Sequence, residues 1–199
     1  MLPLLVACCL TNLADVAPGP GLPDGWDLRR VRGRPAPAYA VTEEAALRVA
    51  GAGAVGYAVF ELPDRLPPED GVLTWRWRTA TPLPDADLRD RRRDDSPVRV
   101  LVVFRDRRTL FYTWGRAEPP GEWFASWTGS SRMVWVLRDA KDADGEWCEE
   151  RRNPFTDYRT AFDRDPPAIV AVGIVQDSDN LGHPASAEVA DLSWTPVAR

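Results

Sequence analysis

Two apolar runs of equal length, residues 98–104 and 169–175, constrain the fold of this chain most strongly. The first is apolar on both faces apart from Arg99, which is typical of a central β-strand. Acidic residues precede the first run and follow the second: Asp94, Asp95, Asp177 and Asp179. If the two strands are antiparallel neighbours, these acids meet at one edge of the sheet, whereas parallel neighbours would separate them by about 20 Å. We expect the antiparallel arrangement and a polar site at that edge.

Alternation between apolar and polar residues predicts further strands. Within residues 72–78, Trp75 and Trp77 share one face, which we assign to the core. Residues 154–162 are the one clear helix, because an Asn cap and a Pro at the first helical position precede aromatic residues at helical spacing. Roughly ten short strands, this helix and frequent turns predict an all-β sandwich.

The N-terminus carries Leu5-Val6-Ala7-Cys8, which resembles the lipobox of bacterial lipoproteins, where the cysteine is lipidated. No Lys or Arg precedes it and its apolar run is short, which a start codon assigned too far downstream would explain. The alternative is a hydrophobic strand or a chance match. We predict a truncated export signal and a linker over residues 1–22, and one β-sandwich domain over 23–199. The expected location is the periplasm or the outer membrane, or the cytoplasm if Met1 is the true start.

Composition restricts the classes of molecule that we expect this chain to bind. The chain has 25 basic and 30 acidic residues, a net charge of −5, and its basic run at 89–93 is interleaved with acids. We therefore expect no nucleic-acid partner, and membrane contact only through an N-terminal lipid anchor. The three cysteines have neither zinc nor disulfide spacing. A catalytic pair of Cys148 with His183 lacks any triad signature.

Four motifs, in this order, resemble the bacterial domain of unknown function 3047 family. They are Trp75-Arg76-Trp77-Arg78, Asp94-Asp95 with Val98-Arg99-Val100, Arg151-Arg152-Asn153 with Asp157-Tyr158-Arg159, and Asp177-Ser178-Asp179-Asn180. The resemblance extends from about Trp26 onward. It implies an exported protein with a jelly-roll-like antiparallel β-sandwich, of the kind seen in carbohydrate-binding modules. It implies no activity and no catalytic residue.

Tryptophans in or beside the loop at 115–131 suggest a sugar ligand. Aromatic faces stack against sugar rings, while carboxylates and amides bind the hydroxyl groups. The alternative is that these rings only close one end of the sandwich. The candidate ligand-binding residues are Asp94, Asp95, Arg99, Trp114, Trp123, Trp127, Arg132, Asp177, Asp179 and Asn180.

The acidic cluster has three interpretations: an internal Arg–Asp network, ligand contacts, or a metal site. For a metal, Asp177, Asp179 and Glu188 match positions one, three and twelve of the calcium-loop pattern. Position five is Leu181, which has no side-chain ligand atom, and strands flank the loop. Both features argue against an EF-hand. Calcium in a β-sandwich loop stays open, and no other cofactor is expected.

These observations favour a non-catalytic, exported binder of carbohydrate or of a cell-envelope component, acting through an acidic and aromatic sheet edge. One alternative is a glycan hydrolase or lyase that uses an Asp pair, with Tyr112 as a conceivable lyase base. The other alternative is a purely structural domain whose acids serve only as ion-pair partners.

Overall fold

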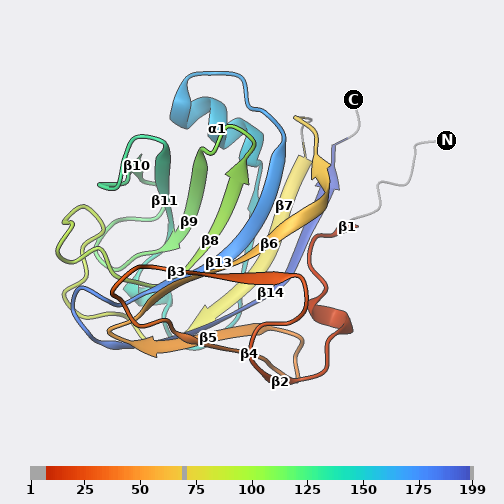
Figure 1. Cartoon of the computed structure of the whole chain (residues 1–199). Coiled ribbons are helices and arrows are strands. Elements are labelled where there is room, and N and C mark those ends of the chain that lie inside the picture. Colours follow the sequence, from red (N-terminus) through yellow and green to blue (C-terminus); the bar gives the residue numbers. More distant parts are fainter. Residues whose placement is uncertain (1–7, 69–70, 198–199) are drawn as a thin grey trace.

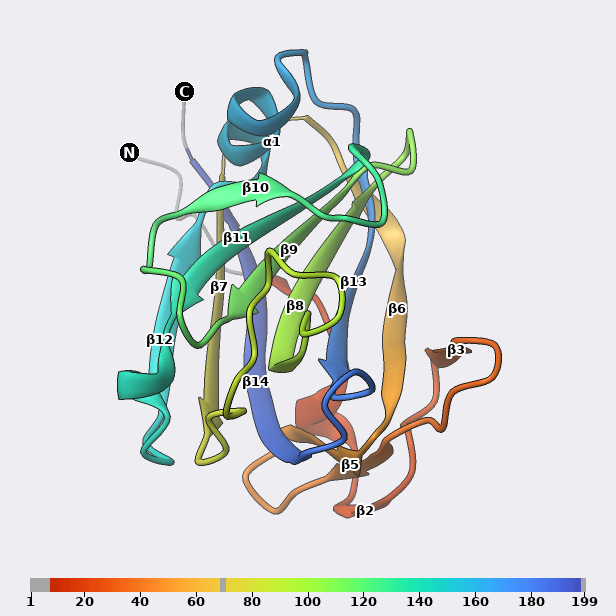
Figure 2. The same ribbon diagram turned by 90° about the vertical axis from the view of Figure 1, so that its left-hand side faces the viewer.

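The computed structural model describes residues 8–68 and 71–197 and forms two seven-stranded sheets packed face to face, with one α-helix at one end (Figure 1, Figure 2). The expected jelly-roll-like β-sandwich is therefore confirmed. Within the described ranges, no helix is long and apolar enough to cross a membrane.

Sheet A has the strand order β12-β7-β14-β5-β4-β2, with β1 also paired to β14. Its strands are β1 (Cys8–Cys9), β2 (Gly19–Pro20), β4 (Ala38–Val41), β5 (Leu47–Ala52), β7 (Gly71–Thr79), β12 (Cys148–Arg152) and β14 (Pro184–Pro196). Sheet B has the order β10-β11-β9-β8-β13-β6-β3. Its strands are β3 (Trp26–Arg30), β6 (Val55–Leu66), β8 (Ser96–Phe104), β9 (Thr109–Trp114), β10 (Trp123–Ala125), β11 (Arg132–Arg138) and β13 (Ile169–Asp177).

One strand pair departs from the expected antiparallel pattern. Strands β9 and β11 run parallel, with Thr109 opposite Arg132. The physical reason is the long segment between them, which includes β10 and returns the chain to the end of the sheet where β9 begins.

The core lies between the sheets, and aromatic residues dominate it. Trp75 and Trp77 of β7 are buried, as the alternation predicted. Their rings pack across the sandwich: Trp75 lies 5.3 Å from Tyr112, and Trp77 lies 5.3 Å from Trp114, between ring centroids. Because β8 is apolar on both faces, its even-numbered residues enter this core while Leu101 joins a second cluster on the outside of sheet B.

Helix α1 (Pro154–Phe162) forms as predicted and closes one end of the sandwich (Figure 1). The Asn153 side chain accepts hydrogen bonds from the backbone N–H groups of Phe155 and Thr156, which caps the first turn. The helix packs Phe155 and Tyr158 into the core, and Tyr158 donates a hydrogen bond to Asp106 in the β8–β9 turn. The helix therefore anchors the end of β8 that lies opposite its acidic start.

The N-terminal segment differs from the expected linker. Strand β1 pairs with β14, β2 pairs with β4, and Leu10 and Leu13 are buried in the core. Residues 8–22 are thus part of the sandwich, because their apolar side chains have a core to enter. Residues 5–7 of the lipobox-like motif lie outside the described residues, and Cys8 is exposed.

Candidate functional site

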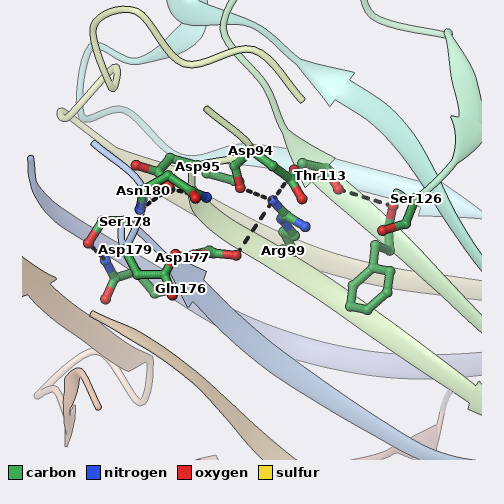
Figure 3. A network of polar contacts seen from close by, with 12 residues as sticks. Asp94, Asp95, Arg99, Thr113, Ser126, Gln176, Asp177, Ser178, Asp179 and Asn180 are labelled. Atoms are coloured by element: carbon green, nitrogen blue, oxygen red, sulfur yellow. Dashed lines mark hydrogen bonds and ion pairs between the residues drawn. The ribbon is translucent and has the colours of Figure 1, made fainter. Parts of the chain in front are cut away.

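Antiparallel pairing of β8 with β13 brings the predicted acids together, which confirms the expected convergence (Figure 3). Val175 lies opposite Arg99 and Asp177 lies opposite Ser96. One carboxylate oxygen from each of Asp95, Asp177 and Asp179 lies within 4.8 Å of the others. We call Asp94, Asp95, Arg99, Asp177, Asp179 and Asn180 the acidic edge.

Asp95 is a structural member of the acidic edge. It is buried and accepts three hydrogen bonds: from the backbone N–H of Asn180 (3.1 Å), from the Asn180 amide (3.2 Å) and from the backbone N–H of Leu181 (2.9 Å). These bonds tie the end of the β7–β8 loop to the β13–β14 loop. Asn180 therefore belongs to the site as a partner of Asp95.

Asp94 and Arg99 form a buried ion pair, with 2.8 Å between Oδ1 and Nη2. The same nitrogen donates to the backbone carbonyl of Asp94. The other oxygen of Asp94 accepts a hydrogen bond from the indole N–H of Trp127. A buried ion pair thus fixes the position of a tryptophan that is itself 53% exposed.

Asp177 is the member whose charge is least well compensated. Its Oδ2 lies 3.9 Å from Arg99 Nη2, and its buried Oδ1 has no hydrogen-bond partner among the described residues. Burial raises the pKa of Asp177 to about 7, against the opposing charge of Arg99 and with added repulsion from neighbouring Asp179. Arg99 compensates this charge only partly, because the nitrogen nearest to Asp177, Nη2, already binds Asp94 at 2.8 Å.

Asp179 is paired with an arginine that the sequence analysis did not select. Arg34, in the β3–β4 loop, lies 3.1 Å from Asp179 through Nε and also donates to its backbone carbonyl. Burial nevertheless raises the pKa of Asp179, and Arg34 opposes this shift. Only the tertiary structure brings β3–β4 to this edge, since residue 34 has no sequence pattern that links it to residue 179.

The three predicted tryptophans have different environments. Trp127 contacts the acidic edge through its hydrogen bond to Asp94. Trp114 is fully buried against Trp77 and donates its indole N–H to the carbonyl of Asp139, so its prediction as a ligand-binding residue is wrong. Trp123 is 40% exposed at the edge strand β10, where its ring stacks on Trp135 at 5.7 Å. Strands β11 and β9 separate it from β8.

The outer face of sheet B carries the remaining candidates. Tyr57, Val175 and Arg99 lie side by side on β6, β13 and β8, and Thr113 continues the row on β9. Arg132 is exposed at the start of β11 and shares this face by strand alternation. Its side chain makes no ion pair with any residue that the structure describes. The sequence analysis did not select Tyr57, because alternation along its strand predicts two faces without showing which of them is the outer one.

The prediction of Glu188 as a metal ligand is wrong. Glu188 lies in β14, where it pairs with Arg48 (2.6 Å) and Arg78 (2.7 Å), so it does not join Asp177 as a metal ligand. The reason is that β14 begins at Pro184 and carries Glu188 into sheet A. The third carboxylate beside those of Asp177 and Asp179 is that of Asp95.

Tyr112 does not face a cleft, as a lyase base would have to do. It is fully buried and donates a 2.7 Å hydrogen bond to Asp157, which also forms a bidentate ion pair with Arg152. Burial raises the pKa of Tyr112 well above its ordinary value, and the charge of Asp157 adds to this shift. Such a group is a structural link between β9 and α1.

The fold and the acidic edge together define a β-sandwich protein with an arginine-compensated acidic site beside an exposed tryptophan. The chain belongs to the family described as protein of unknown function (DUF3047), whose model matches residues 24–193. No curated protein sequence matches it.

Several solved structures are similar in fold at low identity. The family 11 carbohydrate-binding module of the cellulosomal cellulase Lic26A-Cel5E of Clostridium thermocellum is 10% identical, with a TM-score of 0.45 over 92% of this chain and 98% of that one. The xyloglucanase domain of NopAA from Sinorhizobium fredii, in complex with cellobiose, is 11% identical, with a TM-score of 0.47 over 90% and 98%. The agarase AgWH50C is 8% identical, with a TM-score of 0.45 over 96% of this chain, which spans 25% of the agarase chain.

Proposed function

We propose that the protein is a non-catalytic carbohydrate-binding domain that holds a glycan against Trp127 on the outer face of sheet B. One observation carries the proposal: an indole that is 53% exposed is held in place by a hydrogen bond to the buried Asp94–Arg99 pair. This hydrogen bond restricts the rotamers of the Trp127 side chain before any ligand binds. A stacking platform gains affinity from it, because the ring loses no rotamer freedom on binding.

The surroundings of Trp127 suit a hydroxyl-rich ligand. On the outer face of sheet B, the partly buried side chains of Tyr57 and Val103 pack on a buried apolar cluster and offer surface against which C–H groups can pack. At its acidic end, Asp177 Oδ2 and the carboxylate of Asp179 supply hydrogen-bond acceptors. Arg132 supplies donors. Apolar surface with a few convergent polar groups is the usual composition of a small-molecule site.

The test is a glycan array with the purified domain, followed by titration of the best ligand. Trp127→Ala should weaken binding about tenfold or more, which corresponds to about 1.4 kcal/mol. Trp123→Ala is the matched control, since it removes another exposed tryptophan from the same sheet. Equal affinity of the Trp127→Ala protein and the unmodified protein would leave the acidic edge as a structural ion-pair network and refute the proposal.

A glycan hydrolase is the second candidate, favoured by the environment of Asp177. Its pKa of about 7 lets it donate a proton at neutral pH, and its oxygen lies within 4.8 Å of one from Asp179. Glycosidases use a pair of neighbouring carboxyl groups, one of which acts as the acid. Product analysis of any glycan that binds separates the two functions: shortened chains that disappear with Asp177→Asn indicate hydrolysis.

We propose export to the periplasm with a lipid anchor on Cys8, supported by the lipobox-like Leu5-Val6-Ala7-Cys8. The genomic sequence upstream of Met1 tests this. An in-frame start that encodes basic and further apolar residues supports export, and a stop codon directly upstream of Met1 contradicts it.

A further inference from the structure

The outer face of sheet A presents a second tryptophan with a fixed position. Trp147 lies over two neighbouring arginines of β7: the guanidinium carbons of Arg76 and Arg78 are each 4.4 Å from its ring centroid. Its indole N–H donates a 3.1 Å hydrogen bond to Glu44. The ring is partly exposed. Because its position is fixed by three partners, Trp147 offers a preorganised aromatic surface on the side of the sandwich opposite Trp127.

A cavity adjoins each of the two arginines that contact Trp147. The smaller one measures about 180 Å³ and includes Arg76 in its wall, and the larger one measures about 370 Å³ and includes Arg78. The larger cavity is within the range of roughly 300–1,000 Å³ that is common for small-molecule sites. Its wall also holds Thr42, Glu43 and Glu44. Trp147 lines neither cavity itself, but it contacts one wall residue of each, Arg76 and Arg78.

Six charged side chains of this surface form ion pairs with one another. Arg78 pairs with Glu188 and Glu44, Arg48 pairs with Glu188, and Arg76 pairs with Asp191. Three cations thus face three carboxylates. An anionic ligand would have to compete with these carboxylates for the arginines, whereas a neutral ligand with hydroxyl groups can bind the lone pairs and N–H groups that the ion pairs leave free.

We infer that the outer face of sheet A is a second carbohydrate site, which takes neutral sugar residues in the two cavities that adjoin the arginine partners of Trp147. The sugar C–H groups pack on the indole ring, and the hydroxyl groups bind the ion-paired side chains of the cavity walls. This site shares no residue with the Trp127 site, so its existence does not depend on that proposal. If both sites bind one polymer, their linkage raises the overall affinity through effective concentration.

The experiment uses the full chain carrying Trp127→Ala, so that the site on sheet B is removed. A neutral β-linked glucose tetrasaccharide and a tetragalacturonate of the same length are titrated separately. The readout is the indole N–H signals in ¹H–¹⁵N spectra, with the Trp147 signal assigned from the Trp147→Phe spectrum. The neutral probe should shift the Trp147 signal, and Trp147→Ala should weaken the affinity about tenfold or more. Trp147→Phe keeps an aromatic face and should lose less.

Trp123→Ala, added to the same background, is the matched control and should leave the affinity unchanged. A Trp147 signal that does not move, or an affinity that Trp147→Ala leaves unaltered, overturns the second site. Equal or tighter binding of the tetragalacturonate overturns the assignment to neutral sugars. A thermal melt of each variant separates loss of binding from loss of the fold.

Discussion

Replacing Asp177 by Asn should stabilise the protein at neutral and alkaline pH. The wild-type carboxylate is buried, its Oδ1 has no partner, and its contact to Arg99 is 3.9 Å long. These conditions raise its pKa from 3.8 to about 7. In the unfolded chain the group ionises near pH 4, so between about pH 4 and 7 the folded state binds more protons. Stability of the wild type therefore falls as the pH rises through this window, and stays level above it.

The magnitude follows from the width of that window. At 1.36 kcal/mol per pH unit, the difference between 3.8 and about 7 corresponds to about 4 kcal/mol as an upper limit. The Asp177 side chain is 14% exposed, so water lowers this cost, and we expect about 2–3 kcal/mol. For a chain of this length, that difference raises the melting temperature by roughly 5–10 °C.

The assay is urea unfolding and thermal melting of both proteins from pH 4 to pH 8.5, with and without calcium. The Asn variant should match the wild type near pH 4 and exceed it increasingly up to pH 7. Asp191→Asn, on the opposite sheet with a 63% exposed side chain, is the control and should show no such divergence. The reasoning would be refuted by parallel pH profiles, or by a wild-type stability that rises relative to that of the variant as the pH rises. Either result would show that the attraction of Arg99 for the Asp177 carboxylate outweighs the cost of burying it. A calcium-dependent rise in wild-type stability that Asp177→Asn abolishes would instead indicate a metal site.

Two further predictions concern the framework of the site. Gly173→Ala should destabilise the protein strongly, because the new Cβ would lie 2.4 Å from the carbonyl oxygen of Ala58 on the neighbouring strand. Gly19→Ala is the control, since a Cβ at residue 19 would meet no atom within 4 Å. Equal melting temperatures of the two variants would contradict the close pairing of β13 with β6. Trp77→Ala should cost about 3–5 kcal/mol in urea unfolding, because it leaves a large cavity beside Trp114, and a fully stable variant would contradict the core assignment.

The acidic edge was predictable because strand pairing is governed by simple rules. Two apolar runs of equal length favour neighbouring central strands, and the antiparallel register then determines where their flanking acids lie. Asp94 and Asp95 precede one strand, and Asp177 and Asp179 follow the other, so no side-chain detail was needed. Alternation assigned the core face of β7 for the same reason.

Contacts between elements distant in sequence were not predictable. Arg34 reaches Asp179 only because the β3–β4 loop lies beside the β13–β14 loop. Glu188 satisfied a calcium-loop pattern in sequence, but β14 carries it to sheet A, where Arg48 and Arg78 are its neighbours. A spacing pattern records distance along the chain, and it loses its meaning when a strand interrupts the loop that the pattern assumes.

The sequence by itself determined the all-β class, the capped helix at 154–162 and the meeting of the acids, since local periodicity and strand length encode all three. Only the tertiary structure decided which tryptophans are available to a ligand. Trp114 and Trp127 are chemically identical, yet one is buried between the sheets and the other is exposed over the buried Asp94–Arg99 pair. Burial depends on what the opposite sheet and the loops place against a ring, and that information is spread over the whole chain.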